Sequence, residues 1–229
     1  MKIKFLGNGS GFASTHTNAY FIENNTFVIL DCSMLNLNKL LKLKPWTYDN
    51  SYLFITHMHD DHFSGVNLFI QYYYYVYKTK LNIVVPKELQ EDILIEFKLK
   101  GISLDICNVI LTNELNENWF IDKIKTNHAL ELDGKCFGYE FNINGVHCVY
   151  SGDTNTLKPY IDKLTPNTEF YVDVSASYGG VHLKYDDIKD TLFKLVNNNV
   201  DIYIMHIDDE IKMRELIKNT KINIVEIIN

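Results

Sequence analysis

The chain has 229 residues, of which 46% are hydrophobic and 22% are charged, and its formal net charge is −7. This balance is that of a globular protein, and the negative charge argues against a long nucleic acid as substrate, because proteins that grip one usually carry a basic face. No run approaches the ~18 apolar residues of a membrane span, and Gly7 and Gly9 interrupt the apolar start too early for a signal peptide. We therefore expect a single domain over residues 1–229, located in the cytoplasm.

The first half of the chain is predicted to mix strands with helices. A turn at Asn24-Asn25 separates two expected strands, and Pro86 suits the first turn of a helix that runs to about Lys98. Four consecutive tyrosines, at 72–75, fall inside a predicted helix, where they point all round and favour packing over a stacking face for a base. The predicted strands are 2–6, 19–23, 27–30, 52–56 and 83–85, and the other predicted helices are 35–43 and 66–77.

The second half repeats this pattern. A hairpin turn is expected at Asn144-Gly145, between two segments of high strand propensity. The predicted strands are 119–126, 136–142, 146–150, 170–174, 202–205 and 222–227, and the predicted helices are 157–163, 186–196 and 210–218. Hairpins and intervening helices in both halves predict two packed sheets covered by helices on the outside.

Three histidines and two aspartates crowd into the segment Thr56-His57-Met58-His59-Asp60-Asp61-His62, after a predicted strand and before a predicted helix. Imidazole nitrogens and carboxylate oxygens are good donors to zinc and similar divalent ions. Side chains two apart in extended backbone point the same way, so His57 and His59 can hold one ion. Asp61 and His62, at the turn into the helix, then face a neighbouring position. The segment predicts part of a two-metal site.

Further ligands must come from distant parts of the chain, because one such segment cannot complete two metal shells. His128, Asp153 and His206 each follow a predicted strand, where a rigid scaffold can direct side chains into one site. Each alone is also compatible with an ordinary role, as a hydrogen-bonded histidine or a turn aspartate. Their joint placement at strand ends favours ligands.

The combined pattern resembles the five motifs of metallo-β-lactamase-fold hydrolases. The resemblance implies an α/β fold, the αββα sandwich, in which two mixed sheets are flanked by helices and metals lie at one sheet edge. Asp31, at the end of a predicted strand, matches an aspartate that buttresses the site. The implied cofactors are two divalent ions, zinc with manganese or iron as alternatives. The implied ligands are His57, His59 and His128 for one ion and Asp61, His62 and His206 for the other, with Asp153 bridging.

Three stretches resemble the ribonuclease Z-like phosphodiesterase branch of that family: Phe5-Leu6-Gly7-Asn8-Gly9-Ser10-Gly11, Thr17-Asn18-Ala19-Tyr20 and Tyr150-Ser151-Gly152-Asp153-Thr154. The resemblance implies catalytic roles for Asp61 and His182. His182 resembles the branch's extra histidine near the scissile phosphate, and its alternative is a surface loop histidine. Asp173 is expected to orient His182, and His16 to lie near the site mouth.

The chain departs from ribonuclease Z in two ways. Thr17 stands where arginine is common, and no segment looks like the Gly-rich, basic arm that clasps tRNA. Compact relatives of the branch act on cyclic nucleotides, and some are anti-Pycsar enzymes that destroy cyclic pyrimidine signals. We therefore predict a metal-dependent phosphodiesterase that hydrolyses a small phosphodiester, a cyclic nucleotide, by attack of a metal-bridging hydroxide.

Other functions stay open at this point. A tRNA 3′-processing-type endoribonuclease is the first alternative, and a thioester, lactone or β-lactam hydrolase is the second. Di-iron redox chemistry is disfavoured, because that branch generally has glutamate at the position of His59. A catalytically inactive nucleotide-binding protein is disfavoured because every expected ligand position is filled. Related enzymes are often homodimers, so we expect a homodimer, and no membrane partner.

Overall fold

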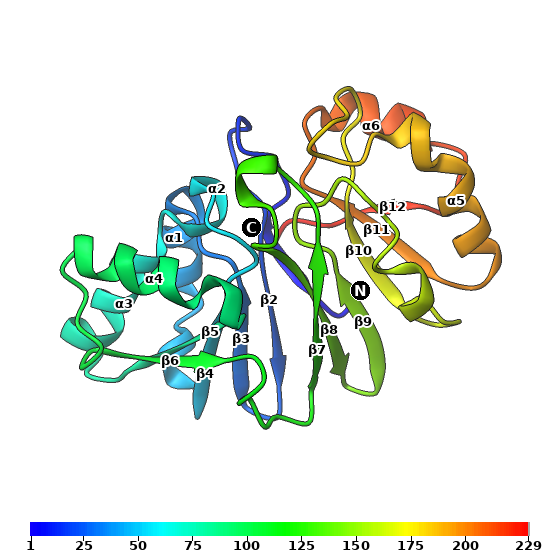
Figure 1. Ribbon diagram of the computed structural model, residues 1–229. Coiled ribbons are helices and arrows are strands. Elements are labelled where there is room, and N and C mark those ends of the chain that lie inside the picture. Colours follow the sequence, from blue (N-terminus) through cyan, green and yellow to red (C-terminus); the bar gives the residue numbers. More distant parts are fainter. Residues whose placement is uncertain (229) are drawn as a thin grey trace.

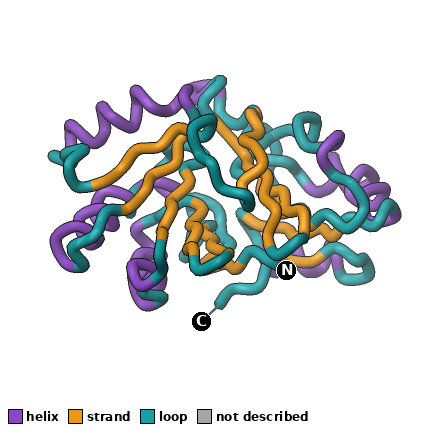
Figure 2. The backbone as a smooth tube through the Cα atoms, turned by 90° about the horizontal axis from the view of Figure 1, so that it is seen from below, coloured by secondary structure: helices purple, strands orange, loops and turns teal. Residues whose placement is uncertain are grey.

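Two six-stranded sheets face each other, and helices cover their outer faces (Figure 1, Figure 2). This arrangement is seen in a computed structural model, which describes residues 1–228. The strand orders are β1-β2-β3-β4-β5-β6 and β12-β11-β10-β9-β8-β7. The predicted sandwich of two mixed sheets flanked by helices is confirmed. Within the described residues, no helix is both long and apolar enough to cross a bilayer.

The first sheet is antiparallel from β1 to β3 and parallel from β3 to β6. Parallel neighbours need a crossover, and helices packed on the outer face supply it. The elements of this half are β1 Lys4–Gly7, β2 Asn18–Glu23, β3 Thr26–Leu30, α1 Met34–Lys42, β4 Asn50–Phe54, α2 Asp60–Phe63, α3 Val66–Gln71, β5 Leu81–Val85, α4 Lys87–Leu99 and β6 Cys107–Leu111.

The second sheet repeats the same order of pairings, antiparallel from β7 to β9 and parallel from β9 to β12. Both central residues of the Asn144-Gly145 turn have positive φ, 48° and 75°, as a two-residue hairpin turn requires. The elements of this half are β7 Phe120–Thr126, β8 Cys136–Ile143, β9 Val146–Tyr150, β10 Glu169–Asp173, α5 Tyr185–Asn197, β11 Asp201–Met205, α6 Glu210–Ile217 and β12 Asn223–Ile224.

Aromatic side chains fill the space between the two sheets. Phe21 of β2 and Phe54 of β4 meet Phe141 of β8 with ring centroids 5.0 and 5.5 Å apart, and Phe54 also meets Tyr139 at 5.0 Å. The rings are in edge-to-face contact, the arrangement that aromatic quadrupoles prefer. At the edge where β4 ends, the Phe137 amide donates to the Thr56 carbonyl at 3.0 Å. This hydrogen bond therefore links the two sheets at that edge.

Two predicted elements differ from the structure, and one strand was not predicted. The helix expected at 157–163 is only a 3₁₀ turn, Ile161–Lys163. The strand expected at 222–227 pairs with β11 only over β12, because the following residues turn to β1, where the Ile228 amide donates to the Phe5 carbonyl at 2.9 Å. Strand β6 was not predicted, because Cys107 and Asn108 begin it with little strand propensity and it lies at the edge of its sheet.

The tyrosine run ends the helix predicted at 66–77 in a π-helical turn. Residues Val66–Gln71 are α-helical and Tyr72–Val76 continue with π-type pairing. Tyr73 points into the core, and the ring of Tyr77 stacks on Trp46 with centroids 3.4 Å apart. The packing role expected for this run is thus seen for Tyr73.

Candidate metal centre

All the predicted ligands follow strand ends at one edge of the sandwich, the upper end in Figure 1, where β7 terminates. His57 and His59 follow β4, and α2 begins directly after His59, which puts Asp61 and His62 in its first turn. The distant ligands, His128, Asp153 and His206, follow β7, β9 and β11. The structure therefore brings all seven predicted metal ligands together.

The first group consists of three imidazoles. His59 Nδ1 lies 3.0 Å from His57 Nε2 and 3.2 Å from His128 Nε2. In a tetrahedral zinc site with Zn–N bonds of about 2.05 Å, neighbouring donor atoms are about 3.3 Å apart. The three nitrogens are therefore spaced to share one ion.

The second group adds carboxylates. Asp61 Oδ2 lies 3.3 Å from His62 Nε2 and 3.1 Å from His206 Nε2. These distances match the spacing of donor atoms that share one ion. Asp153 stands between the groups. Its Oδ1 is 3.2 Å from His62 Nε2, and its Oδ2 is 3.2 Å from His206 Nε2 and 3.8 Å from His57 Nε2. This placement suits a bridging carboxylate.

The ring nitrogens that do not face the centre are held by other parts of the chain. His62 Nδ1 lies 2.7 Å from Asp31 Oδ2, His128 Nδ1 lies 2.7 Å from the Val181 carbonyl, and His57 Nδ1 lies 3.1 Å from the Thr56 hydroxyl. Such contacts fix the tautomer and the ring orientation of metal-binding histidines. Asp31 also accepts the Thr56 amide at 2.8 Å, which is the buttressing role expected for it. The Val181 carbonyl was not predicted, because a backbone group leaves no signal in side-chain patterns.

Within residues 1–228, His62 Nε2 and Asp153 Oδ1 are two of the buried atoms of the cluster that have no hydrogen-bond partner. They approach each other within 3.2 Å, but they do not have hydrogen-bonding geometry. Unpaired buried polar atoms are costly, and a cation between them would satisfy both. The donor set therefore fits a divalent ion.

The charges of the cluster favour the same conclusion. Burial lowers the pKa of His206, but Asp153, Asp173 and Asp61 outweigh it and raise this pKa to about 10. Burial raises the pKa of Asp153, but His206 and His62 outweigh it and hold this pKa well below its usual value. Protons on the imidazoles thus balance the buried carboxylates when no other cation is present. A divalent ion would replace those protons.

His182 lies beside both groups. Its Nδ1 is 2.8 Å from Asp173 Oδ2, and its ring centroid is 4.9 Å from those of His128 and His206. Asp173 is fully buried and also accepts the Thr154 amide at 2.9 Å, so its position is fixed. The expected pairing of Asp173 with His182 is present, and within residues 1–228 it engages Nδ1 and leaves Nε2 of His182 to face a ligand.

The loop between β1 and β2 comes close to the second group. An added Cβ at Gly11 would lie 3.1 Å from Asp61 Oδ2. Burial lowers the pKa of His16, while the charge of Asp61 raises it, so the two groups are near enough to interact. His16 belongs to the same loop, and its place at the site mouth stays a prediction.

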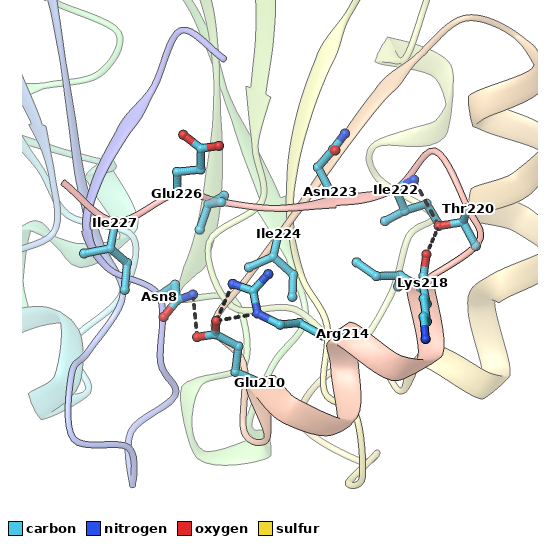
Figure 3. A pocket seen from close by; sticks show the side chains of 12 residues that line it. Asn8, Glu210, Arg214, Lys218, Thr220, Ile222, Asn223, Ile224, Glu226 and Ile227 are labelled. Carbon is cyan, nitrogen blue, oxygen red and sulfur yellow. Dashed lines mark hydrogen bonds and ion pairs between the residues drawn. The ribbon is translucent and has the colours of Figure 1, made fainter.

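A separate groove of about 650 Å³ lies between α6 and the C-terminal segment (Figure 3). Two of its charged groups pair with each other, since Arg214 Nε donates to Glu210 Oε1 at 2.9 Å, and Asn8 Nδ2 donates to Glu210 Oε2 at 3.3 Å. None of the His/Asp groups suited to a metal in residues 1–228 includes a residue of this groove. The strand-end cluster is therefore the candidate site.

A family model described as "Anti-Pycsar protein Apyc1" matches residues 1–228. The chain belongs to this family. Membership of this family together with the His/Asp cluster supports a metal-dependent phosphoesterase. No curated protein is significantly similar to the chain.

Solved structures confirm the metallo-β-lactamase fold. YhfI from Bacillus subtilis is 15% identical with a TM-score of 0.73, and the match covers 97% of this chain and 94% of that one. The short form of human tRNase Z is 17% identical with a TM-score of 0.65 over 91% and 93% of the two chains. Zn²⁺-bound PqqB from Methylobacterium extorquens is 9% identical with a TM-score of 0.72 over 98% and 97%. At these identities, the likeness is one of fold.

Proposed function

We propose that this member of the Apyc1 family is a two-metal phosphodiesterase that hydrolyses a cyclic nucleotide, and that residues 1–229 form one domain. The observation that carries the proposal is the pair of adjoining donor groups, three imidazoles beside two imidazoles and a carboxylate, with Asp153 between them. The family to which the chain belongs supports the cyclic nucleotide as substrate. The net charge of −7 favours a small substrate over tRNA.

His57, His59 and His128 would hold one ion, and Asp61, His62 and His206 would hold the other. Zinc fits the nitrogen-rich donor set best, with manganese or iron as alternatives. Bound ions of this kind lower the pKa of water and neutralise charge on phosphoryl oxygens. Asp61 Oδ2 and His206 Nε2 lie 3.1 Å apart, so both atoms would face the same ion.

His182 would protonate the departing oxygen. Burial lowers the pKa of His182, but Asp173 outweighs this and raises it, which favours the protonated imidazole. Its Nδ1 is engaged by Asp173, which leaves Nε2 as the donor, and its side chain is one-fifth exposed and so reachable by substrate. A general acid of this type is typically worth ~10²–10⁴ in rate.

The test combines elemental analysis with a hydrolysis screen over cyclic mononucleotides, cyclic dinucleotides, precursor tRNA, a thioester and a β-lactam. We expect about two divalent ions per chain and cleavage of a cyclic nucleotide. His59→Ala should abolish activity and reduce bound metal. His147→Gln is the matched control, because His147 lies in β9 and contacts Glu140 and Thr168 instead of the cluster. Full activity of His59→Ala with metal stripped contradicts the proposal.

The homodimer stays a prediction that comes from related enzymes. A mass measurement of the protein in solution checks it, and a mass near 26.7 kDa would show monomers.

A further inference from the structure

The loop between β1 and β2 carries a phenylalanine that lies in water. Phe12 has a relative exposure of 107%, so its ring packs on no other part of residues 1–228. Burial stabilises an apolar ring, so a phenylalanine left in water forgoes that contribution to the fold. A ring left in water at a defined point of a fold is a candidate contact for a ligand.

The turn that presents Phe12 is fastened to the site. The Ala13 amide donates to the Ser10 carbonyl at 2.9 Å, which closes a turn with Gly11 and Phe12 at its centre. The Ser10 amide donates to the Ile207 carbonyl at 3.1 Å, one residue after His206. The turn is therefore hydrogen-bonded to the end of the strand that carries the predicted ligand His206.

The backbone next to Phe12 lies against the second donor group. A Cβ added at Gly11 would come within 3.1 Å of Asp61 Oδ2, so the chain passes directly beside that carboxylate. The Cα of the next residue is only ~3.8 Å further along. Phe12 is therefore adjacent in sequence to the residue that lies against the predicted ligand Asp61, at the rim of the cluster.

We infer that Phe12 is a specificity-determining residue whose ring stacks on the base of a nucleotide held at the cluster. The inference rests on the proposed function, because it takes the scissile phosphate to lie at the metal ligands. Stacking suits this position, since every base has an apolar π-face and the contact needs no hydrogen-bonding partner. The ring would contribute to substrate binding and not to the chemical step.

The first experiment compares a pyrimidine 3′,5′-cyclic nucleotide with ribose 3′,5′-cyclic phosphate, which has the same scissile group and no base. Phe12→Ala should raise KM for the nucleotide by about 5- to 150-fold with kcat nearly unchanged, and should change KM for the base-free compound by less than about twofold. Phe12→Tyr should restore the low KM. Leu99→Ala is the matched control, because Leu99 is also exposed, at the far end of α4.

Two outcomes overturn the inference. An unchanged KM for the nucleotide in Phe12→Ala would show that the ring makes no contact with substrate. An equal loss on both compounds would show that the turn is needed for the fold of the site and not for the base.

A second experiment separates this inference from the proposed function. Phe12→Trp places a fluorophore at the rim, and we expect its emission to be quenched by a nucleoside 5′-monophosphate but not by ribose 5-phosphate. The wild-type protein, with Trp46 and Trp119, gives the background. If the wild type hydrolyses no cyclic nucleotide but the quench occurs, the proposed function fails and stacking stands. If no quench occurs, the stacking inference is wrong, whether or not the protein hydrolyses a cyclic nucleotide.

Discussion

At His182, burial and a carboxylate act on one imidazole in opposite directions, and the carboxylate prevails. The pKa of His182 is raised because Asp173 lies 2.8 Å from Nδ1 and is itself held by the Thr154 amide. At His57, no such carboxylate outweighs burial, and the pKa is lowered well below its usual value. One imidazole is therefore suited to hold a proton and the other to bind a metal as the neutral ring.

His182→Ala should keep its metal and lose turnover. We expect kcat for a cyclic nucleotide to fall by ~10²–10⁴, because the leaving alkoxide needs a proton. The loss should be much smaller for a nitrophenyl phosphodiester, whose leaving group departs as a stable anion. Steady-state kinetics on both substrates, with elemental analysis of the variant, checks this. Equal losses on the two substrates would remove the acid role.

At the scale of elements, the site depends on how closely two strand ends approach. Gly152 precedes Asp153 with φ of 59°, and a Cβ there would lie 2.5 Å from the Phe137 carbonyl and 3.2 Å from Thr56 Cβ. Only glycine lets the loop after β9 pass between β8 and the end of β4. That passage places Asp153 between the two donor groups.

Gly152→Ala should therefore destabilise the protein more than a glycine-to-alanine substitution whose only cost is the positive φ of the backbone. Gly145→Ala is the matched control, because Gly145 also has positive φ, 75°, but nothing lies within 4 Å of an added Cβ. We expect a loss of about 1–2 kcal/mol for Gly145→Ala and a further ~1–3 kcal/mol for Gly152→Ala, with weaker metal binding. Urea unfolding measures both losses. Similar values for the two variants would show that the loop relaxes easily.

For the whole molecule, the candidate site joins the two sheets. His57, His59, Asp61 and His62 follow a strand of the first sheet, and His128, Asp153 and His206 follow strands of the second. Ions shared between these groups would bind the folded chain and not the unfolded one. Their binding free energy would therefore add to the stability of the fold.

Removing the metal with a chelator should lower Tm. An ion present at 100 times its dissociation constant contributes about 2.7 kcal/mol, which is roughly 5–10 °C for a chain of this length. Thermal unfolding before and after chelation, and after returning zinc, measures the effect. The His182→Ala variant should show the same shift, because His182 is not a predicted ligand. An unchanged Tm on chelation would mean that the cluster holds no tightly bound ion.

The sequence by itself determined the local part of the site. The spacing of His57, His59, Asp61 and His62 at the end of a strand places their side chains within a few ångströms through covalent geometry alone. Most strands and helices followed from hydrophobic periodicity, within one or two residues. The edge strand β6 and the 3₁₀ turn Ile161–Lys163 did not, because neither has a clear periodic pattern.

The tertiary structure decided how the distant parts meet. The order of strands in each sheet sets which ends are neighbours, and only this order puts the Val181 carbonyl on His128. It also places the turn at Gly11 against Asp61 and leaves Phe12 in water. These contacts join residues far apart in the chain, or depend on backbone atoms, so no local pattern encodes them.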